Sequence, residues 1–300
     1  MFTGCGTAMV TPFRRDASLD EVALRRLIRR QIEAGIDFLV PCGTTGESPT
    51  LTREEHLRVV AITVELAKGR LPVLAGAGGY NTAEVIAMAR ELAALGVDGL
   101  LSVTPYYNKP TQEGLYQHYR AIAAAVPLPI ILYSVQGRTG VNIEPATVKR
   151  LAAIDNIVGI KEASGNIAQM AAILNAVPER FLVLSGDDAV TLPLIALGGR
   201  GVISVVSNEI PAEMACLTRL CLQNDLSAAR QLYRRYLPLM EVNFVESNPI
   251  PVKAAMAEMG LLEPAWRLPL VPPRPESQAR IRGVLESLGL VERTHVAIAS

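Results

Sequence analysis

Eight short apolar runs, rich in β-branched residues, recur along the chain at intervals of 20 to 35 residues, and a stretch with helical character follows each of them. Continuous apolar runs, rather than alternating ones, are typical of parallel strands that are buried on both faces. The helical stretches supply the crossovers that parallel strands need. The runs begin at Gly6, Asp37, Pro72, Gly99, Pro129, Ile157, Phe181 and Gly201.

This spacing predicts an α/β fold, a closed (β/α)8 TIM barrel, which typically takes about 250 residues. A doubly wound open sheet is the structural alternative, but neither a G-x-G-x-x-G motif after the first strand nor a P-loop occurs here. Strand signals stop after about residue 224. Three helical patterns follow, at roughly 225–244, 249–260 and 276–289. We therefore predict a barrel over residues 1–224 and a C-terminal helical region over residues 225–300.

Local signals mark where several barrel helices should begin and end. Ser18 and Thr52 are each followed three residues later by a glutamate, Glu21 or Glu55, which is the pattern of a capping box. Asn81 is also a residue type that caps helix N-termini. Glycines occur where the first three helices should stop, at Gly35, Gly69 and Gly96.

Composition argues against several classes of function. The 29 basic and 29 acidic residues balance, which argues against a protein that binds nucleic acid through charge. No uninterrupted apolar stretch reaches the ~20 residues of a membrane span, so we expect no membrane partner. His56, His118 and His295 are too far apart in the sequence to suggest a metal site. We expect neither a metal ion nor a dissociable cofactor.

The cysteines indicate the compartment. Cys5, Cys42, Cys216 and Cys221 are scattered and form no C-x-x-C motif. No basic segment followed by an apolar block, as in a secretory signal, begins the sequence. We therefore expect reduced thiols and a cytoplasmic location.

Residues at the C-terminal ends of the strands carry the chemistry of a (β/α)8 barrel. Lys161 is the most informative of them because it interrupts the apolar run that begins at Ile157. Burial of an ammonium group is costly and favours the neutral amine, which can attack a carbonyl carbon and form a Schiff base. The alternative is a lysine that reaches solvent or pairs with Glu162 or Asp187.

Other strand ends supply hydroxyl groups, a cation and a glycine. Tyr133 and Tyr107 offer phenolic protons, and the Thr44 hydroxyl group could link them into a chain that moves protons. Arg138 could bind a carboxylate through two hydrogen bonds, and Gly186 would let backbone amides approach one. Each also has a plainer interpretation, as a tyrosine at the rim, a threonine in a turn or a loop arginine in solvent.

Two further candidates are weaker. Cys42 could be a nucleophile, but no histidine is close to it in the sequence, and a buried structural thiol is the better interpretation. Asp187 and Asp188 could bind a hard metal ion, but two adjacent acids do not make a site.

The motifs at these strand ends resemble those of the dihydrodipicolinate synthase family. This family belongs to the pyruvate-dependent class I aldolase superfamily, which also contains N-acetylneuraminate lyase. The resemblance covers nearly the whole chain, and its motifs coincide with the strand ends located from the apolar runs. They are G-T-T-G-E at 43–47, P-Y-Y-N at 105–108, Tyr133 followed by R-T-G at 138–140, G-I-K-E-A-S-G at 159–165, S-G-D-D at 185–188 and N-P-I-P-V-K at 248–253.

The resemblance implies a lyase that condenses pyruvate with L-aspartate 4-semialdehyde in the biosynthesis of diaminopimelate and lysine. In such an enzyme Lys161 would form the Schiff base with pyruvate, and Tyr133 would donate and accept protons. Thr44 and Tyr107 would complete the proton relay. Tyr107 would reach the site of the neighbouring subunit in a tight dimer.

The resemblance also implies how the substrates are held. Thr45 and the backbone at Ile203 would bind pyruvate, near Gly186. Arg138 would bind the carboxylate of aspartate semialdehyde. Members of the family are commonly tetramers built as dimers of dimers, so a homotetramer is implied here.

Two alternatives to this activity stay open at the level of sequence. Ser134 and Gln136 stand where the family usually has asparagine and proline. One alternative is therefore another pyruvate-dependent aldolase of the superfamily that acts on a sugar acid or a hydroxy-oxo acid, although Arg138 favours the synthase. The remote alternative is a catalytically silent barrel that acts as a binding protein. The argument against it is the presence of all four residues of the implied chemistry, Lys161, Tyr133, Thr44 and Tyr107.

Overall fold

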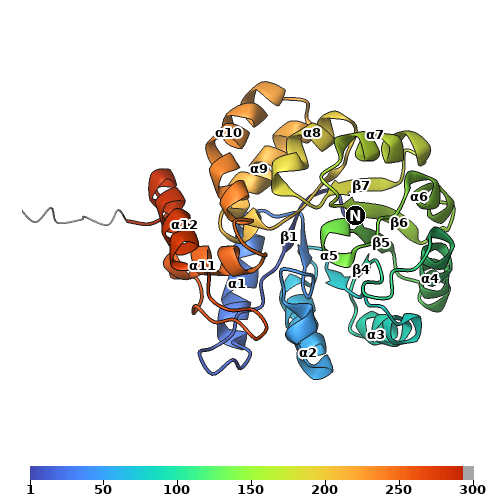
Figure 1. Cartoon of the computed structure of the whole chain (residues 1–300), viewed down its shortest axis with the longest axis horizontal. Helices are drawn as coiled ribbons and strands as arrows, with labels where there is room; N and C mark the ends of the chain where they lie inside the picture. Colours follow the sequence, from blue (N-terminus) through green and yellow to red (C-terminus); the bar gives the residue numbers. More distant parts are fainter. Residues whose placement is uncertain (293–300) are drawn as a thin grey trace, which may run out of the picture.

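Eight parallel strands form the centre of the molecule, and helices surround them (Figure 1). A computed structural model describes residues 1–292. Each predicted apolar run overlaps one strand, although β1 begins two residues before the predicted Gly6, so the (β/α)8 barrel is confirmed. The strands are β1 (Gly4–Ala8), β2 (Phe38–Val40), β3 (Leu74–Gly76), β4 (Gly99–Val103), β5 (Ile130–Ser134), β6 (Ile157–Glu162), β7 (Leu182–Ser185) and β8 (Gly201–Ser204).

The barrel closes between β2 and β3. The other neighbouring strands pair in the order β2-β1-β8-β7-β6-β5-β4-β3. A parallel bridge between Leu39 and Val73 joins the two ends of this order. Two backbone hydrogen bonds support it, from Leu39 N to Pro72 O at 3.0 Å and from Gly76 N to Pro41 O at 3.0 Å.

Helices connect the strands and cover the outside of the barrel. Their bounds are α1 (Glu21–Glu33), α2 (Arg53–Ala67), α3 (Thr82–Ala94), α4 (Gln112–Ala125), α6 (Pro145–Leu151), α7 (Ile167–Ala176), α8 (Thr191–Ala196) and α9 (Pro211–Leu222). A one-turn helix, α5 (Gln136–Thr139), follows β5 directly. Short 3-10 helices occupy three of the loops, η1 (Ser48–Thr50), η2 (Asp188–Val190) and η3 (Val206–Asn208).

Two of the three predicted helix starts are confirmed. Thr52 and Glu55 form a complete capping box at α2, and the Asn81 side chain accepts from Ala83 N at α3. The predicted capping box at Ser18 is wrong, because Asp20 caps α1 and accepts from Ala23 N.

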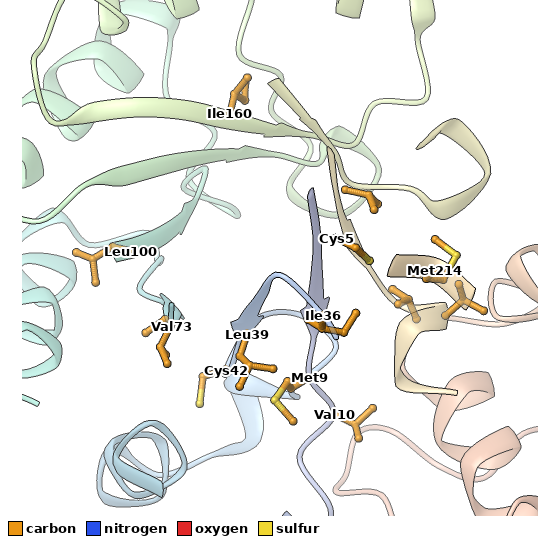
Figure 2. Close-up of a cluster of buried hydrophobic side chains, with 14 of the residues drawn as sticks. Cys5, Met9, Val10, Ile36, Leu39, Cys42, Val73, Leu100, Ile160 and Met214 are labelled. Carbon is orange, nitrogen blue, oxygen red and sulfur yellow. The ribbon is translucent and has the colours of Figure 1, made fainter. Parts of the chain in front are cut away.

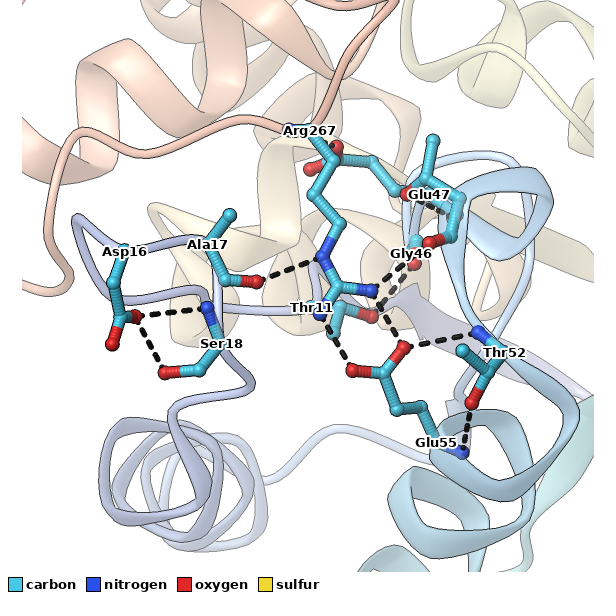
Figure 3. Close-up of polar contacts among 10 residues, drawn as sticks. Thr11, Asp16, Ala17, Ser18, Gly46, Glu47, Thr52, Glu55 and Arg267 are labelled. Carbon is cyan, nitrogen blue, oxygen red and sulfur yellow. Dashed lines mark hydrogen bonds and ion pairs between the residues drawn. The ribbon is translucent and has the colours of Figure 1, made fainter.

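Ser18 belongs to a tight turn instead. Its backbone N–H and its hydroxyl group both donate to Asp16 Oδ1 (Figure 3), and an antiparallel bridge joins Phe13 and Leu19 on either side of the turn. The predicted glycine stops are confirmed, since Gly35, Gly69 and Gly96 all adopt positive φ angles.

Three helices follow the barrel, in agreement with the predicted appendage. They are α10 (Leu226–Val242), α11 (Ile250–Glu258) and α12 (Pro275–Leu288). The last part of the predicted helical region, residues 293–300, lies outside the described residues. Because α10 packs directly against α9 of the barrel, the boundary at residue 224 stays a prediction. Among residues 1–292, no helix is long and apolar enough to cross a bilayer.

The core has two parts, because neighbouring residues of a strand point to opposite sides of the barrel wall. The larger part lies between the strands and the helices, and includes Leu39, Leu100 and Ile160 (Figure 2). The smaller part fills the barrel interior with side chains from most of the strands. Its strand members are Ala8, Phe38, Val40, Leu74, Leu101, Ile131, Tyr133, Leu184 and Ile203.

Candidate active site

Lys161 and Tyr133 lie side by side at the C-terminal end of the barrel interior. They are directly paired in register on β6 and β5, and Lys161 Nζ is 4.3 Å from the centroid of the Tyr133 ring. Their side chains are almost fully buried, with relative exposures of 5% and 6%. Among residues 1–292 Lys161 forms no ion pair, so the pairing with Glu162 or Asp187 that the sequence left open does not occur.

Those two acids are occupied elsewhere. Glu162 follows Lys161 on β6, so its side chain points to the other side of the barrel wall. Its carboxylate accepts from Gln169 Nε2 at 2.8 Å, and burial raises the pKa of this carboxyl group. Asp187 accepts from Ala189 N at 2.9 Å. Lys161 is therefore a buried amine without a carboxylate partner in the described part of the chain.

Gly186 provides the space beside this amine. A Cβ atom at Gly186 would lie 2.5 Å from Ala163 Cβ and 3.1 Å from Lys161 Cε. A side chain at this position would therefore collide with Ala163, just after β6, and press on the lysine. Ile203 on β8 also belongs to the barrel interior, and it is paired in register with Gly6 of β1.

The loop after β2 brings Thr44 and Thr45 to the same end of the barrel. Thr44 lines a cavity of about 620 Å³ together with Tyr133 and Arg138. Thr45 lies deeper, with 3% of its surface exposed. The loop ends at Glu47, which adopts a left-handed backbone conformation with φ of 52°.

A buried ion pair fixes the end of this loop. Lys253 Nζ donates to Glu47 Oε1 at 2.5 Å, and both side chains are fully buried. The carboxylate compensates for part of the cost of burying the lysine, and burial nevertheless lowers the Lys253 pKa. The ammonium group also lies 4.4 Å from the centroid of the Phe13 ring.

Arg267 holds the neighbouring start of α2. Its guanidinium group forms two hydrogen bonds of 2.6 Å with the carboxylate of Glu55 and also donates to Ala17 O and Thr50 O (Figure 3). It stacks 4.2 Å from the centroid of the Phe13 ring. The C-terminal region therefore fixes both ends of the segment between the loop and α2.

Asn248 connects the C-terminal region to two predicted substrate contacts. Its Nδ2 donates to Thr45 Oγ1 at 3.0 Å. Its backbone carbonyl accepts from the Arg138 guanidinium at 2.8 Å. Asn248 itself is buried, with 4% of its surface exposed.

Arg138 lies on the one-turn helix α5. Arg138 N donates to Val135 O, and Gly140 closes the turn with a positive φ angle. Gln136, which stands at the family's proline position, is the exposed first residue of α5, where a helix leaves backbone N–H groups without internal partners. Ser134 is buried, and its hydroxyl oxygen accepts from Ile143 N. These two departures are therefore accommodated by a regular local structure.

Tyr107, another predicted site residue, is exposed to solvent in a single chain. Its side chain is 91% exposed, and its φ angle is 68°. It does not line the cavity, whereas its neighbour Tyr106 does. Within residues 1–292 the hydroxyl groups of Thr44, Tyr107 and Tyr133 form no hydrogen bonds to one another, so a single chain does not assemble the predicted relay.

The weaker sequence candidates have structural roles. Cys42 is 2% exposed, and burial raises the pKa of its thiol, which disfavours the thiolate. Asp188 Oδ2 accepts from the backbone N–H groups of Val205 and Val206, and burial raises its pKa to about 6. Asp188 therefore ties the loops after β7 and β8 together.

Glu47, Asn248 and Lys253 are structural residues of the site that were not predicted, although all three fall within the motifs that carry the resemblance. One signal was available: Lys253 interrupts the apolar segment Ile250–Met256, just as Lys161 interrupts its strand. Its partner could not be identified, because Glu47 is 206 residues away.

Comparisons with known proteins agree over almost the full length. The model of the Dihydrodipicolinate synthetase family matches residues 1–288. The chain is 54% identical to the 4-hydroxy-tetrahydrodipicolinate synthase of Koribacter versatilis, with 98% of each chain covered. It is 52% identical to that of Acidobacterium capsulatum, again with 98% of each covered.

Solved structures give the same result. The dihydrodipicolinate synthase of Aquifex aeolicus superposes with a TM-score of 0.95 at 43% identity, covering 97% of this chain and 100% of that one. The chloride-inhibited dihydrodipicolinate synthase of Acinetobacter baumannii, solved with pyruvate, gives the same TM-score, identity and coverage.

Proposed function

Because the chain belongs to the dihydrodipicolinate synthetase family, we propose that Lys161 forms a Schiff base with pyruvate. The chain is a lyase with the 4-hydroxy-tetrahydrodipicolinate synthase activity of diaminopimelate and lysine biosynthesis. The observation that carries the proposal is the place of Lys161, a buried amine beside Tyr133 and Gly186 at the C-terminal end of the barrel.

The proposed reaction begins with attack of the neutral Lys161 amine on the keto carbon of pyruvate. Loss of water gives the imine, which withdraws electrons and lets the pyruvate methyl group lose a proton. The resulting enamine carbon attacks the aldehyde carbon of aspartate semialdehyde, whose oxygen takes up a proton. The substrate's own amine then replaces the lysine nitrogen, which closes the ring and releases Lys161. Tyr133 is the group beside Lys161 that donates and accepts these protons.

The substrate contacts follow from the same arrangement. Thr45, Gly186 and the backbone at Ile203 hold pyruvate over Lys161. Arg138, which lines the cavity, binds the carboxylate of the semialdehyde. Four free cysteines and the family relationship support a cytoplasmic location.

We expect Arg138→Ala to weaken the use of the semialdehyde and to spare pyruvate. A hydrogen-bonded contact with a charged group contributes about 1.5–3 kcal/mol, so kcat/KM for the semialdehyde should fall roughly 10–100-fold. The measurement is steady-state kinetics with pyruvate and a panel of aldehydes. Arg150→Ala, which removes an exposed arginine on α6, is the matched control. An unchanged kcat/KM for the semialdehyde would refute the role of Arg138.

Tyr107 is proposed to act in the site of a neighbouring subunit, within a homotetramer built from two dimers. Its 91% exposure and its absence from the cavity of its own chain support this arrangement. Its backbone has a positive φ angle, a conformation that non-glycine residues rarely adopt. A relay of Thr44, Tyr133 and a second subunit's tyrosine would then be complete only in the dimer.

Complementation tests this shared site. We expect activity to reappear when inactive Tyr107→Phe subunits are mixed with inactive Lys161→Ala subunits under conditions that allow exchange. A mixed dimer then contains one site with both residues intact and one with neither. Each mixed dimer should therefore have about half the activity of a normal dimer. Mass measurement confirms the exchange. If exchange is complete and activity stays low, Tyr107 acts within its own chain.

A further inference from the structure

Asn248 lies between the two substrate subsites of the proposed function. It is buried at the start of α11, and it contacts one residue from each subsite, Thr45 through its side chain and Arg138 through its backbone carbonyl. Neither contact is local in the sequence, since 203 residues separate Asn248 from Thr45 and 110 separate it from Arg138. Asn248 therefore connects the C-terminal region to residues of both proposed substrate subsites.

We propose that Asn248 is a positioning residue that fixes the direction of the Thr45 hydroxyl proton. A hydroxyl group has one proton to donate and lone pairs that accept. Because Thr45 Oγ1 accepts from Asn248 Nδ2, the Thr45 proton is free to point at another acceptor. The inference rests on the proposed function, in which that acceptor is the carboxylate of pyruvate.

The partners of the Asn248 amide support this orientation. Within residues 1–292, Asn248 Oδ1 is buried and has no hydrogen-bond partner. With the amide turned over, Oδ1 would take the Thr45 proton, and the buried NH2 group would be left without an acceptor. Buried N–H groups without partners are rarer in proteins than carbonyl oxygens with unused capacity. The orientation that leaves the threonine proton for substrate is the one that avoids this cost.

A second contact from the C-terminal region lies close to this one. Lys253, five residues further along the chain, forms the buried ion pair with Glu47. Glu47 is two residues after Thr45, so the segment from Asn248 to Lys253 contacts the loop after β2 at two points. The backbone that carries Asn248 is thereby held against the loop that carries Thr45.

Asn248→Asp tests the inference, because a carboxylate has nearly the same shape and can only accept hydrogen bonds when it is ionised. The Thr45 hydroxyl group would then donate to the new carboxylate and lose its proton for pyruvate. We expect kcat/KM for pyruvate to fall roughly 10–100-fold. We expect kcat/KM for the semialdehyde to change less than about threefold, because the backbone carbonyl that binds Arg138 remains.

A double-mutant cycle with Thr45→Val separates this mechanism from charge repulsion. If Asn248 acts through the Thr45 hydroxyl group, adding Asn248→Asp to Thr45→Val should lower kcat/KM for pyruvate by no more than about twofold, because the effects of coupled residues are not additive. Repulsion between carboxylates would persist in the double variant. Asn224→Asp, which adds the same charge on the surface after α9, is the control.

Two results would overturn the inference. One is an unchanged kcat/KM for pyruvate in Asn248→Asp, and the other is an equal loss with and without the Thr45 hydroxyl group. Failure of the proposed function looks different, since the unmodified protein would then give no borohydride-trapped pyruvate adduct at all.

Discussion

Replacing Lys161 with alanine should abolish the covalent pyruvate adduct and lower turnover by roughly a thousandfold or more. No other lysine in residues 1–292 lies in the barrel interior beside Tyr133. Without an amine there, the keto group of pyruvate is not converted into the imine that makes its methyl group acidic. The measurement is incubation with pyruvate and borohydride, followed by peptide mass mapping, in parallel with a turnover assay.

Lys149→Ala is the matched control for this experiment, because Lys149 is an exposed lysine on α6. That variant should keep both the adduct and the turnover. A borohydride-stabilised adduct on a different lysine, or an intact adduct in Lys161→Ala, would show that Lys161 is not the covalent residue.

Replacing Lys253 with methionine should lower the free energy of unfolding far more than breaking an exposed ion pair does. Glu47 would be left buried without its partner, and breaking a buried ion pair from one side typically costs about 3–5 kcal/mol in the free energy of unfolding. For a chain of this size we expect Tm to fall by roughly 10 °C. Thermal unfolding followed by circular dichroism measures the shift.

Two further variants make this result interpretable. Glu47→Gln in the Lys253→Met background removes the unpaired charge and should restore most of the lost stability. Arg58→Ala removes one side of an exposed ion pair with Glu21, and pairs of that kind contribute about 0–1 kcal/mol. If Lys253→Met shifted Tm as little as Arg58→Ala does, the buried pair would not stabilise the fold as we infer.

The sequence predicted the barrel because its signal is local. Most of the parallel strands are short apolar runs, and several of the helices between them begin at a side-chain cap, as at Thr52 and Asn81. Lys161 and Tyr133 could be found once the strands were located, because the C-terminal ends of the strands in a barrel meet at one face. The capping box predicted at Ser18 is wrong because the turn at Asp16 uses the same residue types and side-chain hydrogen bonds as a helix cap.

The contacts that the sequence did not predict join segments about 200 residues apart. No period or spacing relates Asn248 to Thr45, or Lys253 to Glu47, and the pairs form only when α11 packs over the loop after β2. The loop that carries Tyr107 contains two positive φ angles, at Tyr107 and Lys109. The turn-forming residues Pro105 and Asn108 indicate a loop here, but they do not specify its conformation.

The long sequence separation of the Asn248–Thr45 and Lys253–Glu47 contacts matters while the chain is being synthesised. A ribosome that adds about 5–20 residues per second delivers Asn248 and Lys253 roughly 10–40 s after Thr45 and Glu47. During that time all eight strands can emerge, yet the Glu47 carboxylate has no ammonium partner and the loop after β2 lacks its contacts with Asn248 and Lys253. The catalytic pocket is therefore among the last parts of the molecule to mature, and a nascent chain that already contains Lys161 is not yet a working enzyme.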